Sequence, residues 1–272
     1  MTFAPDLYIH DTSRRHIERY IAQPAHAVLL HGAVGVGATT IARSMARALG
    51  DTMPLTVETI DGKEISIGQI RELYTLTRGT HHDTQVVIID DAHRLSLSAQ
   101  HAFLKLLEEP PENTHFVLVA HEPHLLLPTI HSRVQSIELQ RLTTDTTSSL
   151  IRDHISDEAT RRQLQFIASG LPAQILRLNN DADELATSFA RARSAKAFVE
   201  ATTYDRLILL QQFIKDREQA IAVVEMIGLI VERSSIRQPQ LTPKLAILSR
   251  CLDRLHDNAH VRLQLMSLAL SL

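Results

Sequence analysis

A glycine-rich segment near the N-terminus has the clearest potential for chemistry. Its glycines let backbone N–H groups converge on an anion, and a helix starting directly after them would add the positive end of its dipole. This spacing is typical of a phosphate-binding loop, in which a lysine contacts the phosphates and the next hydroxyl holds Mg²⁺. Thr39 offers that hydroxyl, but Ala38 stands at the lysine position. The candidate nucleotide-binding residues of the segment are Gly32, Gly35, Gly37, Ala38, Thr39 and Thr40.

The alanine at position 38 changes what this loop can do. A charge-assisted contact contributes about 1.5–3 kcal/mol, so its absence weakens nucleotide binding by about tenfold to a hundredfold. It also removes a positive charge where a transferred phosphoryl group becomes negative. Two interpretations stay open: a tight strand-to-helix connection without a ligand, or a weak nucleotide site. In either case we expect no ATP hydrolysis by the chain alone.

Two carboxylates follow the apolar run Val86–Ile89 and form a second candidate site. In a working phosphate site the first, Asp90, would support Mg²⁺ through water, and a glutamate at the next position would orient the attacking water. Asp91 stands at that second position and is one methylene shorter. The alternative is a solvated acidic pair at the end of a strand.

Alternating strands and helices must position these residues in the N-terminal half. The apolar runs predict strands, and the segments between them show helical periodicity. Strands that alternate with helices at this spacing predict an α/β domain with a parallel sheet covered on both faces. The predicted strands are 27–31, 57–60, 86–89, 115–120 and 135–139, and the helices are 13–22, 39–49, 67–77 and 98–109.

After about residue 140 the sequence predicts only helices. We interpret residues 1–140 as the α/β domain, 141–180 as a small helical domain and 181–272 as a larger all-α domain. The predicted helices are 145–155, 157–169, 172–179, 181–200, 203–214, 217–233, 241–256 and 258–271.

The composition limits which classes of protein and which kinds of metal site we expect. Hydrophobic residues make up 44% and charged residues 22%, and no apolar stretch approaches the roughly 20 residues of a membrane span. With no signal peptide evident at its start, we expect a cytoplasmic protein without membrane contact. Cys251 is the only cysteine, which excludes an internal disulfide and a multi-cysteine zinc site. We interpret His121, His124 and the pair His81-His82 as loop or exposed histidines rather than metal ligands.

Several longer segments resemble the bacterial clamp-loader AAA+ family. The most specific are Leu106-Leu-Glu-Glu-Pro-Pro-Glu-Asn-Thr114 and Pro128-Thr-Ile-His-Ser-Arg133, together with residues 65–73 and 86–95. Within that family the chain looks most like the delta-prime subunit of DNA polymerase III, with gamma/tau as the near relative. The similarity is detailed over residues 26–139 and looser in the helical remainder.

The resemblance implies a fold, partners and a process. It implies a RecA-like AAA+ core with a parallel sheet, a helical lid and an all-α collar that holds a five-membered ring of subunits. The expected partners are clamp-loader subunits of the gamma/tau and delta types and, through the complex, a sliding clamp and primer–template DNA. The process would be DNA replication.

One arginine gains a role from the resemblance. Ser132-Arg133 matches the family's Ser-Arg-Cys motif, with Val134 in place of the cysteine. In the family this arginine points across the subunit interface at a neighbour's ATP, and such a trans arginine increases the rate by about 10³–10⁵-fold. Without the resemblance to this family, the sequence would indicate only an ordinary surface arginine at Arg133.

The departures from the family pattern point in one direction. Gly170-Leu-Pro-Ala173 places alanine where the lid's Gly-x-x-Arg pattern has its phosphate-sensing arginine. Three contacts to a nucleotide are thus weakened, by Ala38, Asp91 and Ala173, whereas Arg133 is kept. This combination favours a non-hydrolysing subunit of the delta-prime type that needs no cofactor. We expect weak or no binding of ATP or ADP, with or without Mg²⁺, and no zinc. The alternatives are an active gamma/tau-like ATPase that uses another cation, and a DNA-binding or regulatory module on a decayed AAA+ frame.

Overall fold

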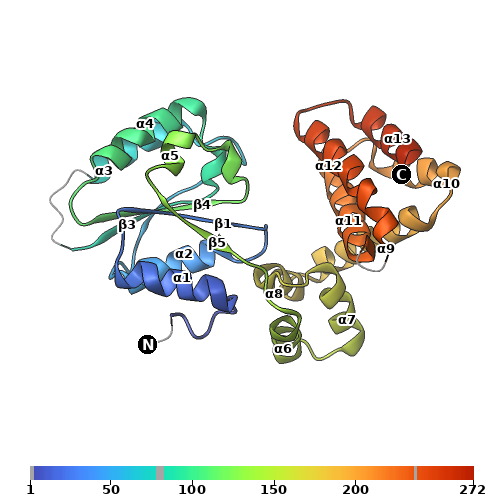
Figure 1. Cartoon of the computed structure of the whole chain (residues 1–272), viewed down its shortest axis with the longest axis horizontal. Helices are drawn as coiled ribbons and strands as arrows, with labels where there is room; N and C mark the ends of the chain where they lie inside the picture. The colour runs from blue at the N-terminus through green and yellow to red at the C-terminus, as the bar shows by residue number, and fades with distance from the viewer. Residues whose placement is uncertain (1–2, 78–82, 236–237) are drawn as a thin grey trace. The chain divides into compact units, whose positions relative to one another are not determined.

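The computed structural model describes residues 3–77, 83–235 and 238–272 (Figure 1). The contacts divide the chain into two compact units, Met1–Asn180 and Asp181–Leu272. Among the described residues, no helix combines the length and the apolar character needed to cross a bilayer. The pair His81-His82 lies outside the described residues.

A parallel sheet of five strands forms the centre of the first unit, in the order β2-β3-β4-β1-β5. The central strand β1 pairs in parallel with β4 on one side and β5 on the other, so Leu29 lies between Leu118 and Ser136. The strands are β1 (Ala27–Gly32), β2 (Leu55–Val57), β3 (Gln85–Ile89), β4 (Thr114–Ala120) and β5 (Gln135–Leu139).

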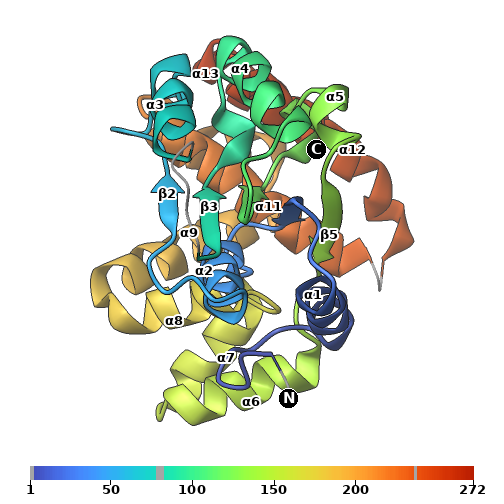
Figure 2. The same cartoon turned by 90° about the vertical axis from the view of Figure 1, so that its left-hand side faces the viewer.

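Helices cover both faces of this sheet (Figures 1 and 2). Successive residues of a strand point to opposite faces, so Val28 and Leu30 join one apolar core while Ala27 and Leu29 join the other. The first core packs α1 (Asp11–Ala22) and α2 (Ala38–Ala48) against the sheet. The second packs α3 (Ile67–Thr77), α4 (Leu97–Glu108) and α5 (Pro128–His131), with the 3-10 turns η1 (Ala92–Arg94) and η2 (Pro123–Leu125) nearby. The predicted α/β core with a parallel sheet, followed by a helical region, is confirmed.

The strand predicted at 57–60 is wrong in its position. Strand β2 ends at Val57, which is paired with Ile89 at the end of β3. The N–H of Asp90 donates to the Val57 carbonyl, and beyond this point the neighbouring chain leaves the sheet. Residues 58–60 therefore have no strand to pair with, and Ile60 is exposed.

Two helices in the C-terminal half differ from their predicted bounds by three residues or more. The helix predicted at 203–214 ends at Leu210 and continues as a 3-10 turn, after which Asp216 caps the next helix by accepting the Gln219 N–H at 3.1 Å. The helix predicted at 258–271 begins only at Val261: Asn258 has a left-handed backbone with φ of 61°, and the N-cap His260 is extended, with φ of −65° and ψ of 110°. A left-handed residue cannot continue a right-handed helix.

Three short helices complete the first unit. Each of the first two begins with a capping side chain: Thr143 accepts the Thr146 N–H at 3.2 Å and Asp157 accepts the Thr160 N–H at 2.7 Å. Gly170, with φ of +79°, turns the chain into the third. These helices are α6 (Thr144–His154), α7 (Glu158–Ile167) and α8 (Pro172–Asn180).

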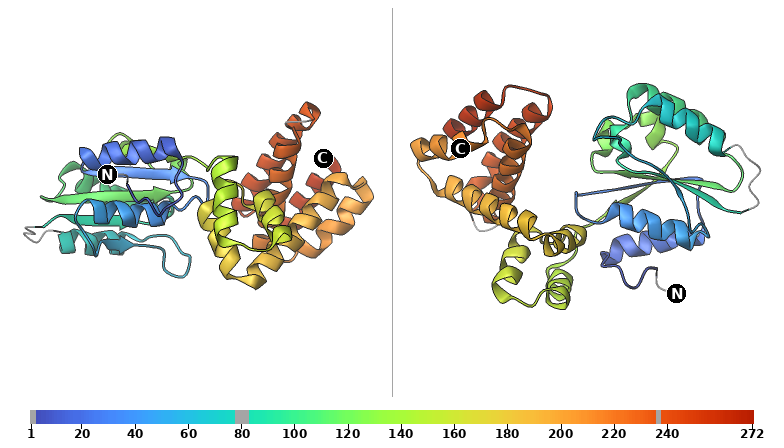
Figure 3. Two further views of the ribbon diagram at one scale, coloured as in Figure 1. Left: turned by 90° about the horizontal axis from the view of Figure 1, so that it is seen from below. Right: turned by 180° about the vertical axis from the view of Figure 1, so that it is seen from behind.

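In the second unit, every element of the described residues is a helix (Figure 3). Its central helix α11 packs against both α9 and α12 and buries a row of aliphatic side chains, including Val224, Ile227 and Val231. Its elements are α9 (Ala182–Glu200), α10 (Thr203–Leu210), η3 (Gln211–Phe213), α11 (Arg217–Ser235), η4 (Pro239–Leu241), α12 (Thr242–His256) and α13 (Val261–Ser271).

Candidate functional site

The glycine-rich segment forms the turn from β1 into α2. Gly35 and Gly37 have φ values of +89° and +91°, a conformation that residues with a side chain rarely adopt. Gly37 is the N-cap of α2, and Thr39 and Thr40 lie in the first turn of that helix. Ala38 is 3% exposed and its methyl group belongs to the apolar core around α2. The local backbone therefore suits a phosphate loop, whereas the side chain at position 38 contributes packing and no charge.

Two oxygen-bearing side chains meet between the loop and the end of β3. The hydroxyl of Thr39 donates to Oδ1 of Asp90 at 2.9 Å, and the same oxygen accepts the N–H of Asp91 at 3.1 Å. Hydroxyl and carboxylate oxygens are ligands that Mg²⁺ accepts. These two residues fit a magnesium ion carried by a nucleotide. Among the described residues, no three His, Cys, Asp or Glu side chains form a metal site by themselves.

Asp91 lies beside this pair but in an unusual backbone conformation. Its φ and ψ are 49° and 44°, in the left-handed region, and it starts the 3-10 turn η1. Aspartate tolerates this region better than most residues because its short polar side chain can bond locally. The structure thus brings Thr39, Asp90 and Asp91 to one edge of the sheet.

The helix α8 lies directly on the loop. The N–H groups of Ala173 and Gln174 both donate to the carbonyl of Gly35, at 3.0 and 3.3 Å. A Cβ atom at Gly35 would lie 2.9 Å from Cβ of Gln174, and one at Gly37 would lie 3.7 Å from Cβ of Ala173. The structure therefore places Ala173 against the loop, and two N–H groups at the start of α8 are satisfied by loop backbone.

Two histidines also lie at this edge: His121, which the sequence predicted as a loop or exposed histidine, and His93. Nδ1 of His121 is 2.9 Å from the carbonyl oxygen of Gly32, the backbone N–H of His121 reaches Nδ1 of His93 at 3.4 Å, and the two rings are 6.0 Å apart. Burial lowers the pKa of His93, and nearby Asp91 and Glu122 oppose that shift. A signal for His121 was present, because it directly follows a predicted strand, and ligands of parallel sheets gather at the carboxyl ends of strands.

Arg133 lies apart from these contacts, on the surface formed by α4 and α5. Its Nη2 atom is 2.8 Å from Oε1 of Glu108, and Nη1 donates to the Thr129 carbonyl at 3.0 Å and to the Ser132 hydroxyl at 3.3 Å. The side chains of Arg133 and Glu108 are 35% and 52% exposed. A guanidinium has five N–H donors, so these three contacts leave two donors for another acceptor. The arginine is held in place and still able to bind an anion.

Sequence comparisons relate the chain to subunits of one bacterial enzyme. A family model described as "DNA polymerase III, delta subunit" matches residues 51–143. The chain is 29% identical over 170 residues to subunit tau of DNA polymerase III from Bacillus subtilis, covering 52% of this chain and 30% of that protein. It is 31% identical over 139 residues to subunit delta' from Pseudomonas aeruginosa, covering 41% of this chain and 42% of that protein. The chain thus spans less than half the length of these relatives.

Solved structures agree with the fold. A DNA polymerase III, gamma subunit-related protein from Thermotoga maritima superposes with a TM-score of 0.59 at 20% identity, covering 94% of this chain and 97% of that one. The RuvB Holliday junction branch migration motor from the same organism gives a TM-score of 0.54 at 16% identity, covering 78% and 84%. The sequence matches show that the chain is similar to the gamma/tau and delta-prime subunits of bacterial DNA polymerase III, and the solved structures show that it shares their fold.

Proposed function

We propose that this chain is a delta-prime-like subunit of the DNA polymerase III clamp loader, acting in DNA replication without hydrolysing ATP itself. In this role it is a scaffold and donates Arg133 to the ATP of a neighbouring subunit. Its partners are gamma/tau and delta subunits in a five-membered ring and, through the complex, the sliding clamp and primer–template DNA. One observation carries the proposal: Arg133 is fixed on the surface with donors to spare, while Ala38 is buried apolar core.

The chain's own loop supports weak or no nucleotide binding. Ala38 and Ala173 both place methyl groups where the family pattern has cations, and the Gly35 carbonyl is already bonded by the first turn of α8. Each missing charge-assisted contact costs about 1.5–3 kcal/mol of binding free energy. If Mg²⁺ with a nucleotide does bind, Thr39 and Asp90 would hold the ion, which would neutralise phosphate charge.

The chemistry of the proposed arginine is favourable. A planar guanidinium bridges two phosphate oxygens at once, and it keeps its charge at every physiological pH. The hydrogen bonds to Thr129 and Glu108 fix its position before any partner arrives. A charged group that is already held in position lowers the activation barrier of a reaction more effectively than one that must first be ordered.

ATP turnover tests the proposal in two preparations. The purified chain should show no turnover, and gel filtration should show it joining gamma/tau and delta subunits. In the reconstituted complex, Arg133→Ala should reduce turnover at the adjoining ATPase site by up to about 10³-fold. Arg133→Lys should also be impaired, since it keeps the charge but loses the bidentate fork.

A matched control exists on the first unit. Arg162 is also an exposed arginine that pairs with a glutamate, Glu158, on a helix surface. Arg162→Ala should leave turnover of the complex unchanged. Robust turnover by the purified chain would overturn the non-hydrolysing role, and a complex indifferent to Arg133→Ala would remove the arginine-finger role.

One observation favours a second candidate, an active gamma/tau-like ATPase. Thr39 and Asp90 remain in contact at 2.9 Å, and the ring of His121 lies beside the loop, with Nδ1 2.9 Å from the Gly32 carbonyl oxygen. For this candidate the purified chain would hydrolyse ATP, and Asp90→Asn would abolish that activity. The same turnover assay therefore separates the two functions.

A further inference from the structure

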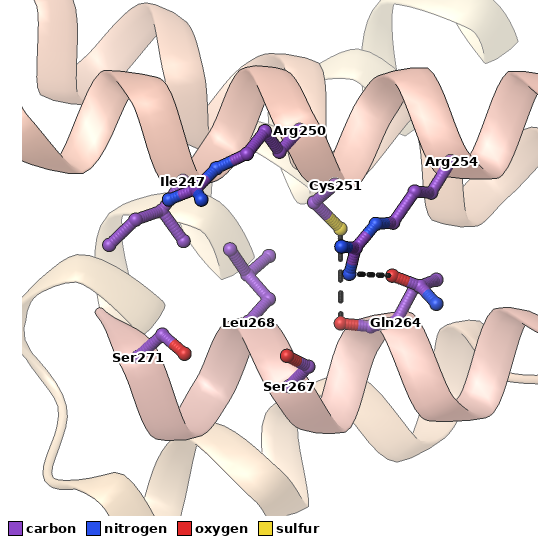
Figure 4. A pocket seen from close by; sticks show the side chains of 8 residues that line it. All are labelled: Ile247, Arg250, Cys251, Arg254, Gln264, Ser267, Leu268 and Ser271. Atoms are coloured by element: carbon purple, nitrogen blue, oxygen red, sulfur yellow. Dashed lines mark hydrogen bonds between the residues drawn. The ribbon is translucent and has the colours of Figure 1, made fainter.

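A cavity in the second unit lies between α12 and α13 and is unrelated to the phosphate loop. Its volume is about 290 Å³. Figure 4 shows Arg250 and Arg254 on the α12 side and Ser267 and Ser271 on the α13 side. The members of each pair are four residues apart, so each pair lies on one face of its helix.

The α12 side supplies positive charge that the cavity itself does not neutralise. No aspartate or glutamate is among the residues that line it. The described contacts of the two guanidiniums are few: Nε of Arg250 donates to the Ala246 carbonyl of its own helix at 3.2 Å, and Nη1 of Arg254 reaches Oε1 of Gln264 at 3.5 Å. Since each guanidinium has five N–H donors, most of them remain available.

The α13 side and the floor add donors without adding negative charge. Ser267 and Ser271 are exposed residues, and the hydroxyl of each can donate a hydrogen bond. Cys251 and Leu268 are 6% and 2% exposed and form the inner wall. Burial raises the pKa of the Cys251 thiol to about 11, so it stays neutral and does not repel an anion.

We propose that this cavity binds a phosphate-type dianion, either inorganic phosphate or the phosphate group of a small phosphorylated molecule. Two guanidinium charges match the charge of about −1.5 to −2 that a phosphate monoester carries at pH 7. Donors that come from two opposite walls require an acceptor with oxygens in several directions, which phosphate has. A carboxylate has a single charge and two oxygens in one plane, and so fits less well.

Calorimetric titration of the whole chain with inorganic phosphate tests the site. We expect saturable binding with a dissociation constant of about 1 mM or lower. Arg250→Gln and Arg254→Gln should each weaken binding by about tenfold, because each removes a charge-assisted contact. Both positions are exposed, so these variants should fold. Arg262→Gln is the matched control, since Arg262 is exposed on α13 and does not line the cavity.

Further titrations identify the ligand and exclude binding at the phosphate loop. Ribose 5-phosphate binding more tightly than inorganic phosphate would assign the site to an organic phosphate, and the reverse order to the free ion. Thr39→Val should leave phosphate binding at this cavity unchanged. Phosphate binding that is lost in Thr39→Val but kept in the two arginine variants would overturn the proposal. Equal affinity for glutamate and phosphate, or binding of duplex DNA without binding of phosphate, would also overturn it.

Discussion

At the scale of single residues, the contact between Glu108 and Arg133 joins two sequence features. Glu108 is the last residue of α4, which ends before Pro110 and Pro111. A carboxylate at a helix C-terminus is unfavourable beside the negative end of the helix dipole, and the guanidinium 2.8 Å away compensates for it. The same contact fixes the direction of Arg133. We therefore treat Glu108 as a positioning residue for the arginine.

This assignment predicts a measurable effect of Glu108→Gln. Exposed ion pairs contribute about 0.2–1 kcal/mol, so turnover of the reconstituted complex should fall by about 1.4- to fivefold. The decrease should appear in kcat with KM unchanged, because a trans arginine acts on the transition state. Steady-state kinetics of the complex measure both constants.

The neighbouring glutamate provides the control for that prediction. Glu109 is exposed, follows α4 as its C-cap and differs from Glu108 in having no ion pair among the described contacts. Glu109→Gln should leave kcat unchanged. Equal kinetics for the two variants would show that Glu108 does not position Arg133.

At the scale of elements, α8 and the phosphate loop act as one packed structure. The carbonyl of Gly35 accepts two N–H groups from the first turn of α8, and Leu171, just before that helix, belongs to the same apolar core as Val36. A helix start with unsatisfied N–H groups would be costly if buried. The loop carbonyl therefore serves as the cap that this helix lacks in its own sequence.

A glycine substitution measures this packing. Gly35→Ala combines strain at φ of +89° with a Cβ contact of 2.9 Å to Cβ of Gln174, and should destabilise the chain by about 2–3 kcal/mol. Gly62→Ala is the control, because Gly62 has φ of +66° but nothing within 4 Å of the added Cβ. Gly62→Ala should lower the free energy of unfolding by about 1–2 kcal/mol, from backbone strain alone. Chemical denaturation of both variants gives the comparison, and equal costs would contradict the close packing of α8 on the loop.

At the scale of the whole molecule, the chain divides into two units at Asn180. Asn179, Asn180 and Asp181 are all exposed at the joint, where α8 ends and Asp181 caps α9. Each unit has its own buried core, which is the requirement for independent folding. The finer division into a core of 1–140, a lid of 141–180 and a collar of 181–272 stays a prediction.

Limited proteolysis tests the independence of the two units. Exposed polar joints are preferred sites of cleavage, so an early cut should fall near residue 180 and yield two resistant fragments. Circular dichroism should show that the C-terminal fragment is helical and melts cooperatively. First cuts within α11, which buries much of its surface, would contradict the division.

The sequence by itself determined most helices and strands of this protein and the side chains available at its candidate site. Period-two and period-3.6 patterns are local, so nearly every helix and strand was predictable, and the glycine spacing with Ala38 predicted a degenerate phosphate loop. Strand β2 was misplaced because apolar residues at 57–60 suit a strand, whereas pairing with β3 stops at Val57. A strand ends where its partner ends, and a local pattern carries no information about the partner.

Only the tertiary structure decided which distant residues share a surface. It brought Ala173 onto the loop, His121 beside Gly32 and Glu108 against Arg133, over sequence separations that no short pattern spans. It also placed arginines of α12 opposite serines of α13 around a cavity that no sequence pattern indicates. Side-chain chemistry is fixed by the sequence, but distances between segments depend on how the helices and strands pack, and binding depends on those distances.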